Sequence, residues 1–198
     1  KNIRTSCVFF CFVVSLLLVL CFLTLAGCSL PRIIVLEDPL SPEEHLNLGV
    51  AYEQKGEWES AINEYKAASR KLPMAYTYLG NVYFQKMEFQ VAEEYYRKAI
   101  KKDPENADAY NNRGITYHVI GRYQKALADY NKSTELNPKY AFAYRNRGIV
   151  YDDLEQYDRA IQDYDKAIEL DPEFTWAYRD RGVAYADLEQ YDRAIQDY

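Results

Sequence analysis

Cysteine is missing from most of this 198-residue sequence. All four cysteines lie within the first 28 residues, at Cys7, Cys11, Cys21 and Cys28. Residues 29–198 therefore contain no disulfide, no thiolate metal site and no cysteine nucleophile.

Histidine and the common catalytic motifs are also scarce. The two histidines, His45 and His118, are far apart in the sequence, and no HExxH, GxSxG or phosphate-binding loop is present. Acidic pairs do occur, and we interpret Asp152 with Asp153, and Asp163 with Asp165, as solvated helix faces rather than catalytic dyads. We expect no catalytic residue, no metal site and no cofactor, and we expect that the protein is not an enzyme.

Positive charge is in short supply. The formal net charge is −6, and once Lys1 and Arg4 are set aside, residues 28–198 hold 22 basic and 30 acidic residues, a net charge of −8. Nucleic-acid binding needs clustered Lys and Arg to neutralise phosphates, so no nucleic-acid partner is expected. Glycine and proline together number 15 against 20 tyrosines, which excludes collagen-like and disordered classes.

The N-terminus has the order of a secretory signal peptide. Lys1 and Arg4 precede an uncharged apolar run over residues 7–23, and small residues follow it. Residues 25–28 read Leu-Ala-Gly-Cys, which resembles the lipobox of bacterial lipoproteins. That resemblance implies a signal peptide over residues 1–27, removal of that peptide, and acylation (palmitate among the acyl chains) of Cys28.

The same resemblance implies a location. Acyl chains on Cys28 would hold the protein on a membrane, and Ser29 at the next position is similar to the outer-membrane class of Gram-negative lipoproteins. The expected location is the bacterial cell envelope, on the outer membrane and facing the periplasm. An uncleaved transmembrane anchor remains the alternative, because the apolar run is about 20 residues long.

Residues 28–41 form the expected tether between the lipidated cysteine and the body. Within it we favour packing of residues 33–36 on the first repeat over a solvated linker, because this aliphatic run is unfavourable in water. The sequence has no initiator Met and stops partway through a helical pattern, so we expect it to be a fragment of a longer reading frame.

The body of the chain is periodic. Glycines recur at spacings of 31, 34, 34 and 34, and every one is followed at +3 by tyrosine, at +12 by alanine and at +16 by tyrosine. Prolines stand 24 residues after the first four. The repeating glycines are Gly49, Gly80, Gly114, Gly148 and Gly182, and the prolines are Pro73, Pro104, Pro138 and Pro172.

This pattern resembles the tetratricopeptide repeat (TPR) family. The resemblance implies an all-α fold, an α-solenoid of helix-turn-helix repeats with a right-handed superhelix, over residues 42–198. The expected repeats are 42–72, 73–106, 107–140, 141–174 and a truncated 175–198. The expected first helices are 43–55, 74–86, 107–120, 141–154 and 175–188, and the second helices are 58–71, 89–102, 123–136, 157–170 and 191 onward.

The pattern also has a physical meaning. Gly and Ala allow two helices to approach closely, tyrosine fills the space between repeats, and proline ends the second helix. At the turn inside each repeat, Met87, Glu155 and Glu189 replace the glycine found at residues 56 and 121, and we expect the turn to form at some cost. The first repeat is three residues short, which predicts an abbreviated loop between Lys71 and Ala75.

Two further features concern the histidines and a recent duplication. His45 stands where the other repeats have tyrosine, and we interpret it as a packing substitute; His118 is expected on the inner face, without a metal. Residues 153–164 recur unchanged at 187–198, as a repeat stack tolerates because each unit contacts only its neighbours.

In TPR proteins the first helices line a concave groove that binds protein or peptide ligands, and the resemblance transfers that expectation to this chain. Exposed aromatic residues beside arginines are typical of peptide anchor sites, although packing of Phe142 and Trp176 on adjacent helices is an open alternative. Capture of a terminal carboxylate is in doubt, because Thr77 stands where a basic residue is needed. The predicted groove residues are Asn81, Phe84, Asn111, Asn112, Phe142, Arg145, Trp176 and Arg179.

The leading hypothesis is therefore a membrane-anchored adaptor that binds a protein or peptide partner and assists envelope complex assembly. It resembles, in architecture, the bacterial TPR lipoproteins of pilus secretin assembly, outer-membrane protein assembly and envelope proteolysis. One alternative is a targeting arm for an enzyme domain beyond Tyr198. Another is self-association, in which a second copy stacks on the unfinished repeat.

Overall fold

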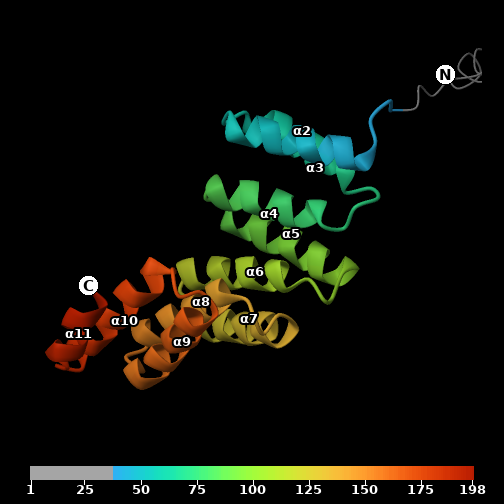
Figure 1. Ribbon diagram of the computed structural model, residues 1–198. Helices are drawn as coiled ribbons and strands as arrows, with labels where there is room; N and C mark the ends of the chain where they lie inside the picture. Colours follow the sequence, from blue (N-terminus) through green and yellow to red (C-terminus); the bar gives the residue numbers. More distant parts are fainter. Residues whose placement is uncertain (1–37) are drawn as a thin grey trace, which may run out of the picture. The chain divides into compact units, whose positions relative to one another are not determined.

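The computed structural model describes residues 38–198, and all the regular structure in that range is helical (Figure 1). The described helices belong to one compact unit, residues 40–198. The helices are α2 (Pro42–Gln54), α3 (Trp58–Ala68), α4 (Ala75–Gln85), α5 (Phe89–Lys102), α6 (Ala107–Val119), α7 (Tyr123–Leu136), α8 (Ala141–Asp153), α9 (Tyr157–Leu170), α10 (Thr175–Asp187) and α11 (Tyr191–Asp197).

The helices form five antiparallel pairs, each pair packing on the next. Contacts join α2 with α3, α4 with α5, α6 with α7, α8 with α9 and α10 with α11, and every second helix also contacts the first helix of the following pair. This is the expected all-α repeat solenoid, and most helix ends lie within one residue of the predicted ends.

The helix that opens the stack has a strong start signal. Ser41 Oγ accepts a hydrogen bond from the Glu44 amide (3.1 Å), and the Glu44 carboxylate accepts one from the Ser41 amide (2.7 Å). Pro42 occupies the first turn, where its missing N–H costs nothing. This capping box fixes the start of α2.

The repeating glycines are required by the repeating tyrosines. A Cβ atom on Gly49 would lie 2.5 Å from the Tyr65 ring, and one on Gly148 would lie 2.6 Å from the Tyr164 ring. Those two tyrosines are fully buried, as are their equivalents Tyr96 and Tyr130. The glycine therefore removes a side chain so that the tyrosine of the second helix can fill the space.

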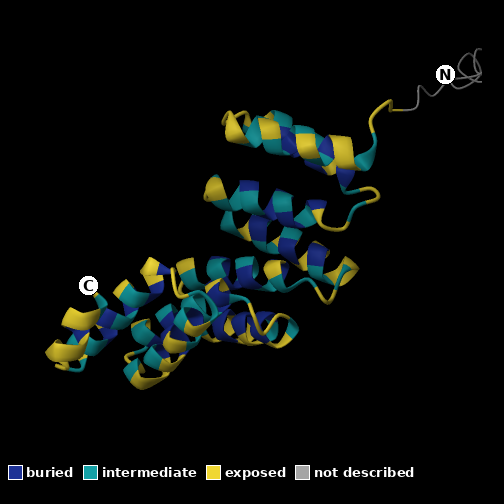
Figure 2. Cartoon of the chain, viewed as in Figure 1, coloured by how far each residue is buried: buried dark blue, intermediate teal, exposed yellow. Residues whose placement is uncertain are grey.

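The last repeat lacks this enclosure. Tyr198, the fifth tyrosine of the series, is 73% exposed, and α11 is mostly exposed (Figure 2). Ile195 on the same helix is also exposed, whereas its equivalent Ile161 packs against the core. Ile161 and Ile195 differ in exposure because α10 packs against α9, the helix that carries Ile161.

The turn inside each repeat forms with or without glycine, as predicted. Gly56 and Gly121 have φ values of 74° and 72°, and Met87, Glu155 and Glu189 have φ values of 62°, 55° and 59°. The left-handed conformation is unfavourable for these three side chains. The neighbouring helices enforce it at all five turns.

The prediction of an abbreviated loop after the first repeat is wrong. The connection over residues 69–74 has six residues, whereas the later ones, such as 103–106, have four. It is the helices that are shorter: α3 and α4 have 11 residues each, against 14 in α5 and 13 in α6. The three-residue deletion is therefore taken up by α3 and α4, while the connection between them is two residues longer than the later ones.

The interpretation of Asp163 as solvated is also wrong. Asp163 is buried, and Arg147 holds both of its oxygens, with Nε–Oδ2 and Nη2–Oδ1 distances of 2.7 and 2.6 Å. The same fork joins Arg113 to Asp129 and Arg181 to Asp197. A buried carboxylate is stable here because it has a bidentate partner.

Several predictions fall outside the described residues. They are the signal peptide, the lipidation of Cys28 and the packing of residues 33–36. Among residues 38–198, no helix is long and apolar enough to cross a bilayer.

Candidate functional site

The candidate site is the layer formed by the first helices of the repeats. Consecutive first helices contact one another from α4 to α6, α6 to α8 and α8 to α10. All eight predicted groove residues belong to α4, α6, α8 and α10. We refer to this surface as the first-helix layer.

The three predicted asparagines contact one another rather than standing free. Asn112 Nδ2 donates to Asn81 Oδ1 (3.0 Å), and Asn111 Nδ2 donates to Asn112 Oδ1 (3.0 Å). Asn146 of α8 extends the chain by donating to Asn111 Oδ1 (3.0 Å), and the Tyr96 hydroxyl donates to Asn81 (2.8 Å). This amide chain links α4, α6 and α8, so much of its hydrogen-bonding capacity is already used.

A hollow of about 220 Å³ lies between α4 and α6, beside these hydrogen-bonded asparagines. Most of its lining residues are uncharged and polar, and the Thr77 hydroxyl among them is buried without a hydrogen-bond partner. Asp108 carries the only formal charge among its lining residues. The lining residues are Met74, Thr77, Tyr78, Asn81, Asn106, Asp108 and Asn112.

The predicted aromatic residues differ in exposure. Phe84 is half-buried and packs edge-on against Phe89 (centroids 5.5 Å apart). Phe142 and Trp176, by contrast, are 53% and 56% exposed. Phe142 also contacts Phe174 at the start of α10 (centroids 4.7 Å apart), so for Phe142 both sequence interpretations hold in part: its ring packs on a neighbour and still presents a large apolar surface.

The two predicted arginines share one buried carboxylate. Arg145 Nη2 lies 2.7 Å from Asp180 Oδ2, and Arg179 donates to Asp180 Oδ1 from Nη2 (2.6 Å) and Nε (3.0 Å). Arg179 also lies over the Trp176 ring, 4.5 Å from its centroid. These contacts hold α8 against α10 and position Trp176.

Both histidines are paired with carboxylates. His45 is buried with Nδ1 2.6 Å from Glu64 Oε2, in keeping with its interpretation as a packing substitute. His118 Nε2 lies 2.6 Å from Asp153 Oδ2 and joins α6 to α8. Within residues 38–198 no group of three or more metal-ligating side chains could hold a metal ion.

Asp152 lies in an unfavourable electrostatic environment. Burial, followed by the charges of Asp187, Asp153 and Asp180, raises the pKa of Asp152 to about 6. Its Oδ1 atom is buried without a hydrogen-bond partner. The interpretation of Asp152 as a solvated residue is therefore wrong.

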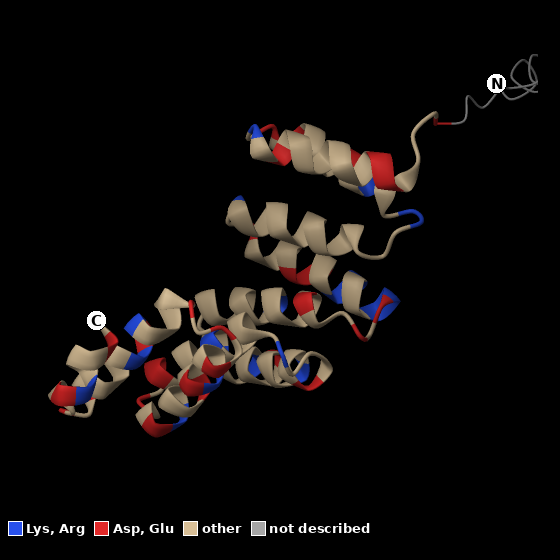
Figure 3. Ribbon diagram, in the orientation of Figure 1, with Lys and Arg blue, Asp and Glu red and all other residues tan. Residues whose placement is uncertain are grey.

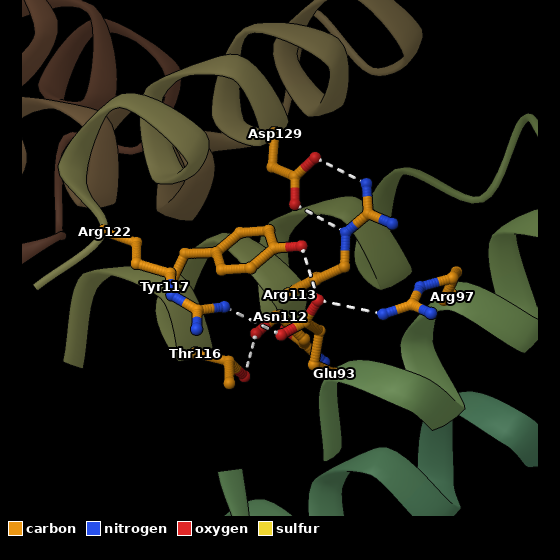
Figure 4. A network of polar contacts seen from close by, with 8 residues as sticks. All are labelled: Glu93, Arg97, Asn112, Arg113, Thr116, Tyr117, Arg122 and Asp129. Atoms are coloured by element: carbon orange, nitrogen blue, oxygen red, sulfur yellow. Dashed lines mark hydrogen bonds and ion pairs between the residues drawn. The ribbon is translucent and has the colours of Figure 1, made fainter. Parts of the chain in front are cut away.

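A polar network behind the first-helix layer joins the second and third repeats (Figure 4). Glu93 of α5 accepts hydrogen bonds from the Tyr117 hydroxyl (3.0 Å), Arg97 (3.0 Å) and Arg122 (3.2 Å). Burial acts to raise the pKa of Glu93, but these partners outweigh it and hold the pKa below its usual range. The other repeats have Ile or Leu at the position equivalent to Glu93. At this junction a charged side chain therefore stands where the other repeats have an apolar one.

Sequence reasoning missed the Arg–Asp forks although a signal exists. In the last three repeats an arginine directly precedes the glycine and an aspartate directly precedes the second tyrosine, 16 residues later. The amide chain has a weaker signal: Asn112 and Asn146 share one repeat position, two residues before the glycine, whereas Asn81 and Asn111 stand at two others.

Comparison with known families agrees with this geometry. Residues 107–140 and 141–174 match the tetratricopeptide repeat profile, and residues 44–73, 80–121 and 163–196 match related TPR profiles. The chain belongs to the tetratricopeptide repeat family.

Two curated relatives match part of this TPR chain. Human tetratricopeptide repeat protein 6 is 38% identical over 77 residues, which are 37% of this chain and 15% of that protein. Small glutamine-rich tetratricopeptide repeat-containing protein 2 of Mycosarcoma maydis is 38% identical over 72 residues, 35% of this chain and 20% of that protein. The chain thus spans a fifth or less of the length of these relatives.

Solved TPR structures match over more of the chain. The crystal structure of MamA is 30% identical with a TM-score of 0.67, over 79% of this chain and 87% of MamA. Pseudomonas aeruginosa pilF is 25% identical with a TM-score of 0.73, over 79% of this chain and 73% of pilF. These similarities place the five helix pairs in a familiar TPR arrangement.

Proposed function

We propose that this protein is a non-catalytic, membrane-anchored adaptor whose first-helix layer binds a protein partner. The observation that carries the proposal is the exposure of Phe142 and Trp176, two large aromatic side chains at equivalent positions of successive repeats. Exposed aromatic residues beside arginine are typical of binding hot spots. A TPR scaffold that interacts with proteins agrees with the family to which the chain belongs.

The envelope location rests on the Leu-Ala-Gly-Cys sequence at residues 25–28. Acylation of Cys28 would place the repeats beside the outer membrane, where they would bring a partner into an envelope complex. Replacing Cys28 with Ser should abolish acyl labelling and leave the precursor uncleaved. Labelling of the C28S variant would overturn this part of the proposal.

Partner recovery tests the adaptor role. The double variant Phe142→Ala/Trp176→Ala removes both exposed rings from the first-helix layer, and Tyr191→Ala removes an exposed ring from α11 as the control. Quantitative affinity purification from envelope extracts should show proteins lost by the double variant and retained by the control. Equal recovery by all three proteins, with equal helicity by circular dichroism, would contradict binding on this layer.

A further inference from the structure

One pair of repeat positions holds polar or charged side chains at three of the four junctions between adjacent first helices, and Phe84 with Val119 at the α4–α6 junction. It consists of the residue four places after the glycine of one repeat and the residue five places after the glycine of the next. Between α2 and α4 this pair is hydrogen-bonded, with Gln85 Nε2 donating to Glu53 Oε1 (2.9 Å). Between α6 and α8 it is His118 with Asp153, 2.6 Å apart. At both junctions the two side chains attract each other.

Between α8 and α10 the equivalent pair is Asp152 and Asp187, two residues of like charge. Among residues 38–198 neither forms an ion pair, although the neighbouring Asp180 has Arg145 and Arg179 as partners. Asp187 repels the charge of Asp152, and the unpartnered Oδ1 of Asp152 agrees with a charge that no residue within 38–198 neutralises.

The acidic pair lies at one end of an exposed apolar strip on α10. Val183 and Asp187 follow Trp176 by 7 and 11 residues, about two and three helical turns, so the three lie on one side of the helix. Trp176 and Val183 are both exposed. The distance from Trp176 to Asp187 along the helix is about 16 Å, the length of about five residues of extended chain.

We infer that this surface binds an extended segment of a partner protein that carries a Lys or Arg about five residues from an aromatic or aliphatic residue. The surface consists of Phe142, Trp176, Val183, Asp152 and Asp187. The inference rests on the proposed function and adds the chemistry of the partner.

Charge complementarity selects a basic segment over an acidic one. An ammonium or guanidinium group beside Asp152 and Asp187 forms charge-assisted hydrogen bonds and cancels their repulsion. The apolar residue of the segment covers Trp176 and Phe142. Arg145 and Arg179 do not reverse this preference, because Asp180 already holds both of them.

Selection from a phage-displayed library of random 12-residue peptides tests the inference, with the full chain kept in detergent. The test variant is Asp152→Asn/Asp187→Asn. The matched control is Asp158→Asn/Asp192→Asn, which removes the same charge from the same two repeats at exposed positions of α9 and α11.

The wild-type chain should enrich peptides with a basic residue about five positions from an apolar one. The D152N/D187N variant should bind these peptides at least tenfold more weakly, while its thermal midpoint stays equal or rises because like charges are removed. The control should bind as the wild type does.

Three results would overturn the inference: enrichment without a basic residue, equal loss in the control, or no enrichment at all. A fall in thermal midpoint together with the loss of binding would assign the aspartates a structural role instead, which also contradicts it. The proposed function is judged separately by the partner-recovery experiment, which does not use the aspartate variants.

Discussion

The first two repeats and the last three build the same helix pair with different chemistry. In repeats 3 to 5 the arginine that precedes the repeating glycine forms a bidentate ion pair with the aspartate that precedes the second tyrosine, as Arg147 does with Asp163. In repeats 1 and 2 the arginine position holds Leu48 or Leu79, and Leu79 is fully buried. Among the first helices, α4 has no charged residue and α10 has four. In Figure 3 α4 is accordingly tan, whereas α10 carries blue and red segments.

The comparison shows which residues define the repeat. The glycine and the buried tyrosine approach equally closely in both regions, with Cβ distances of 2.5 Å at Gly49 and 2.6 Å at Gly148. The helix-pair geometry therefore does not depend on the ion pair. The Arg–Asp fork and the Leu79–Tyr95 pair of repeat 2 occupy equivalent positions, as expected if a buried ion pair and an apolar pair are nearly equal in stability.

Breaking one fork should have the largest effect. Asp163→Ala leaves the Arg147 charge with only Asn131 and Thr134 as partners, and we expect a loss of about 3 kcal/mol in the free energy of unfolding. The equivalent change in repeat 2, Tyr95→Ala, removes a ring stacked on Tyr83 and should cost about 1 kcal/mol. Urea unfolding of both variants measures the difference.

The converse substitution sharpens the same test. The double variant Arg147→Leu/Asp163→Tyr gives repeat 4 the residues of repeat 2, and its stability should return to within about 1 kcal/mol of the wild type. A double variant as unstable as D163A would show that the fork is needed in this repeat.

The glycines allow a second comparison, between enclosed and open repeats. A Cβ at Gly148 meets a fully buried Tyr164, so Gly148→Ala should cost about 1–3 kcal/mol. A Cβ at Gly182 would lie 3.2 Å from the Tyr198 ring, farther than the 2.6 Å at Gly148, so in this chain Gly182→Ala should cost less than half as much. Equal thermal midpoints for the two variants would contradict the account.

The pH dependence of stability should differ between Asp152→Asn and the wild type. Because the folded-state pKa of Asp152 is raised to about 6, the folded protein binds the proton more tightly than the unfolded chain, and stability falls as pH rises through that value. The D152N variant should therefore be more stable at pH 7.5, by about 1 kcal/mol once solvent screening is allowed for, and equal at pH 4. Thermal unfolding across this range, with Asp158→Asn as control, measures it. The ionisable groups around Asp152 are Asp153, Asp180, Asp187, Tyr157 and Tyr164.

The turns should give the smallest effect. Glu155 adopts a left-handed conformation that glycine takes without strain, so Glu155→Gly should raise stability by about 0.5–1 kcal/mol. Gly121→Glu should lower it by a similar amount. Chemical denaturation of the two variants should show changes of opposite sign; changes of the same sign would mean that the turn conformation is not the cause.

The repeat pattern predicted the fold in detail because glycine, alanine, tyrosine and proline each have a steric role that recurs. The second-helix ends at Lys102, Leu136 and Leu170 all lie two residues before a proline. The early end of α3 at Ala68 was not predictable from the same rule. Pro73 stands 24 residues after its glycine, as in the other repeats, and the three missing residues would follow it in the sequence.

The candidate site was less predictable than the fold. Family positions located the first-helix layer, and the exposure of Phe142 and Trp176 is what an anchor site requires. The partners of Asn111 and Arg145 depend on how one repeat meets the next, which spacing within a repeat does not reveal. The isolated charge of Asp152 likewise emerges only when adjacent first helices are compared junction by junction.

The most direct test of the account is a photo-crosslinking scan of one position through the repeats in living cells. A benzophenone amino acid replaces Met74, Phe142 or Trp176, which are equivalent residues of repeats 2, 4 and 5, or the exposed Gln162 of α9 as control. We expect partner adducts at positions 142 and 176, fewer at 74 and none at 162. Adducts of equal yield at all four positions, or at 162 alone, would contradict binding on the first-helix layer.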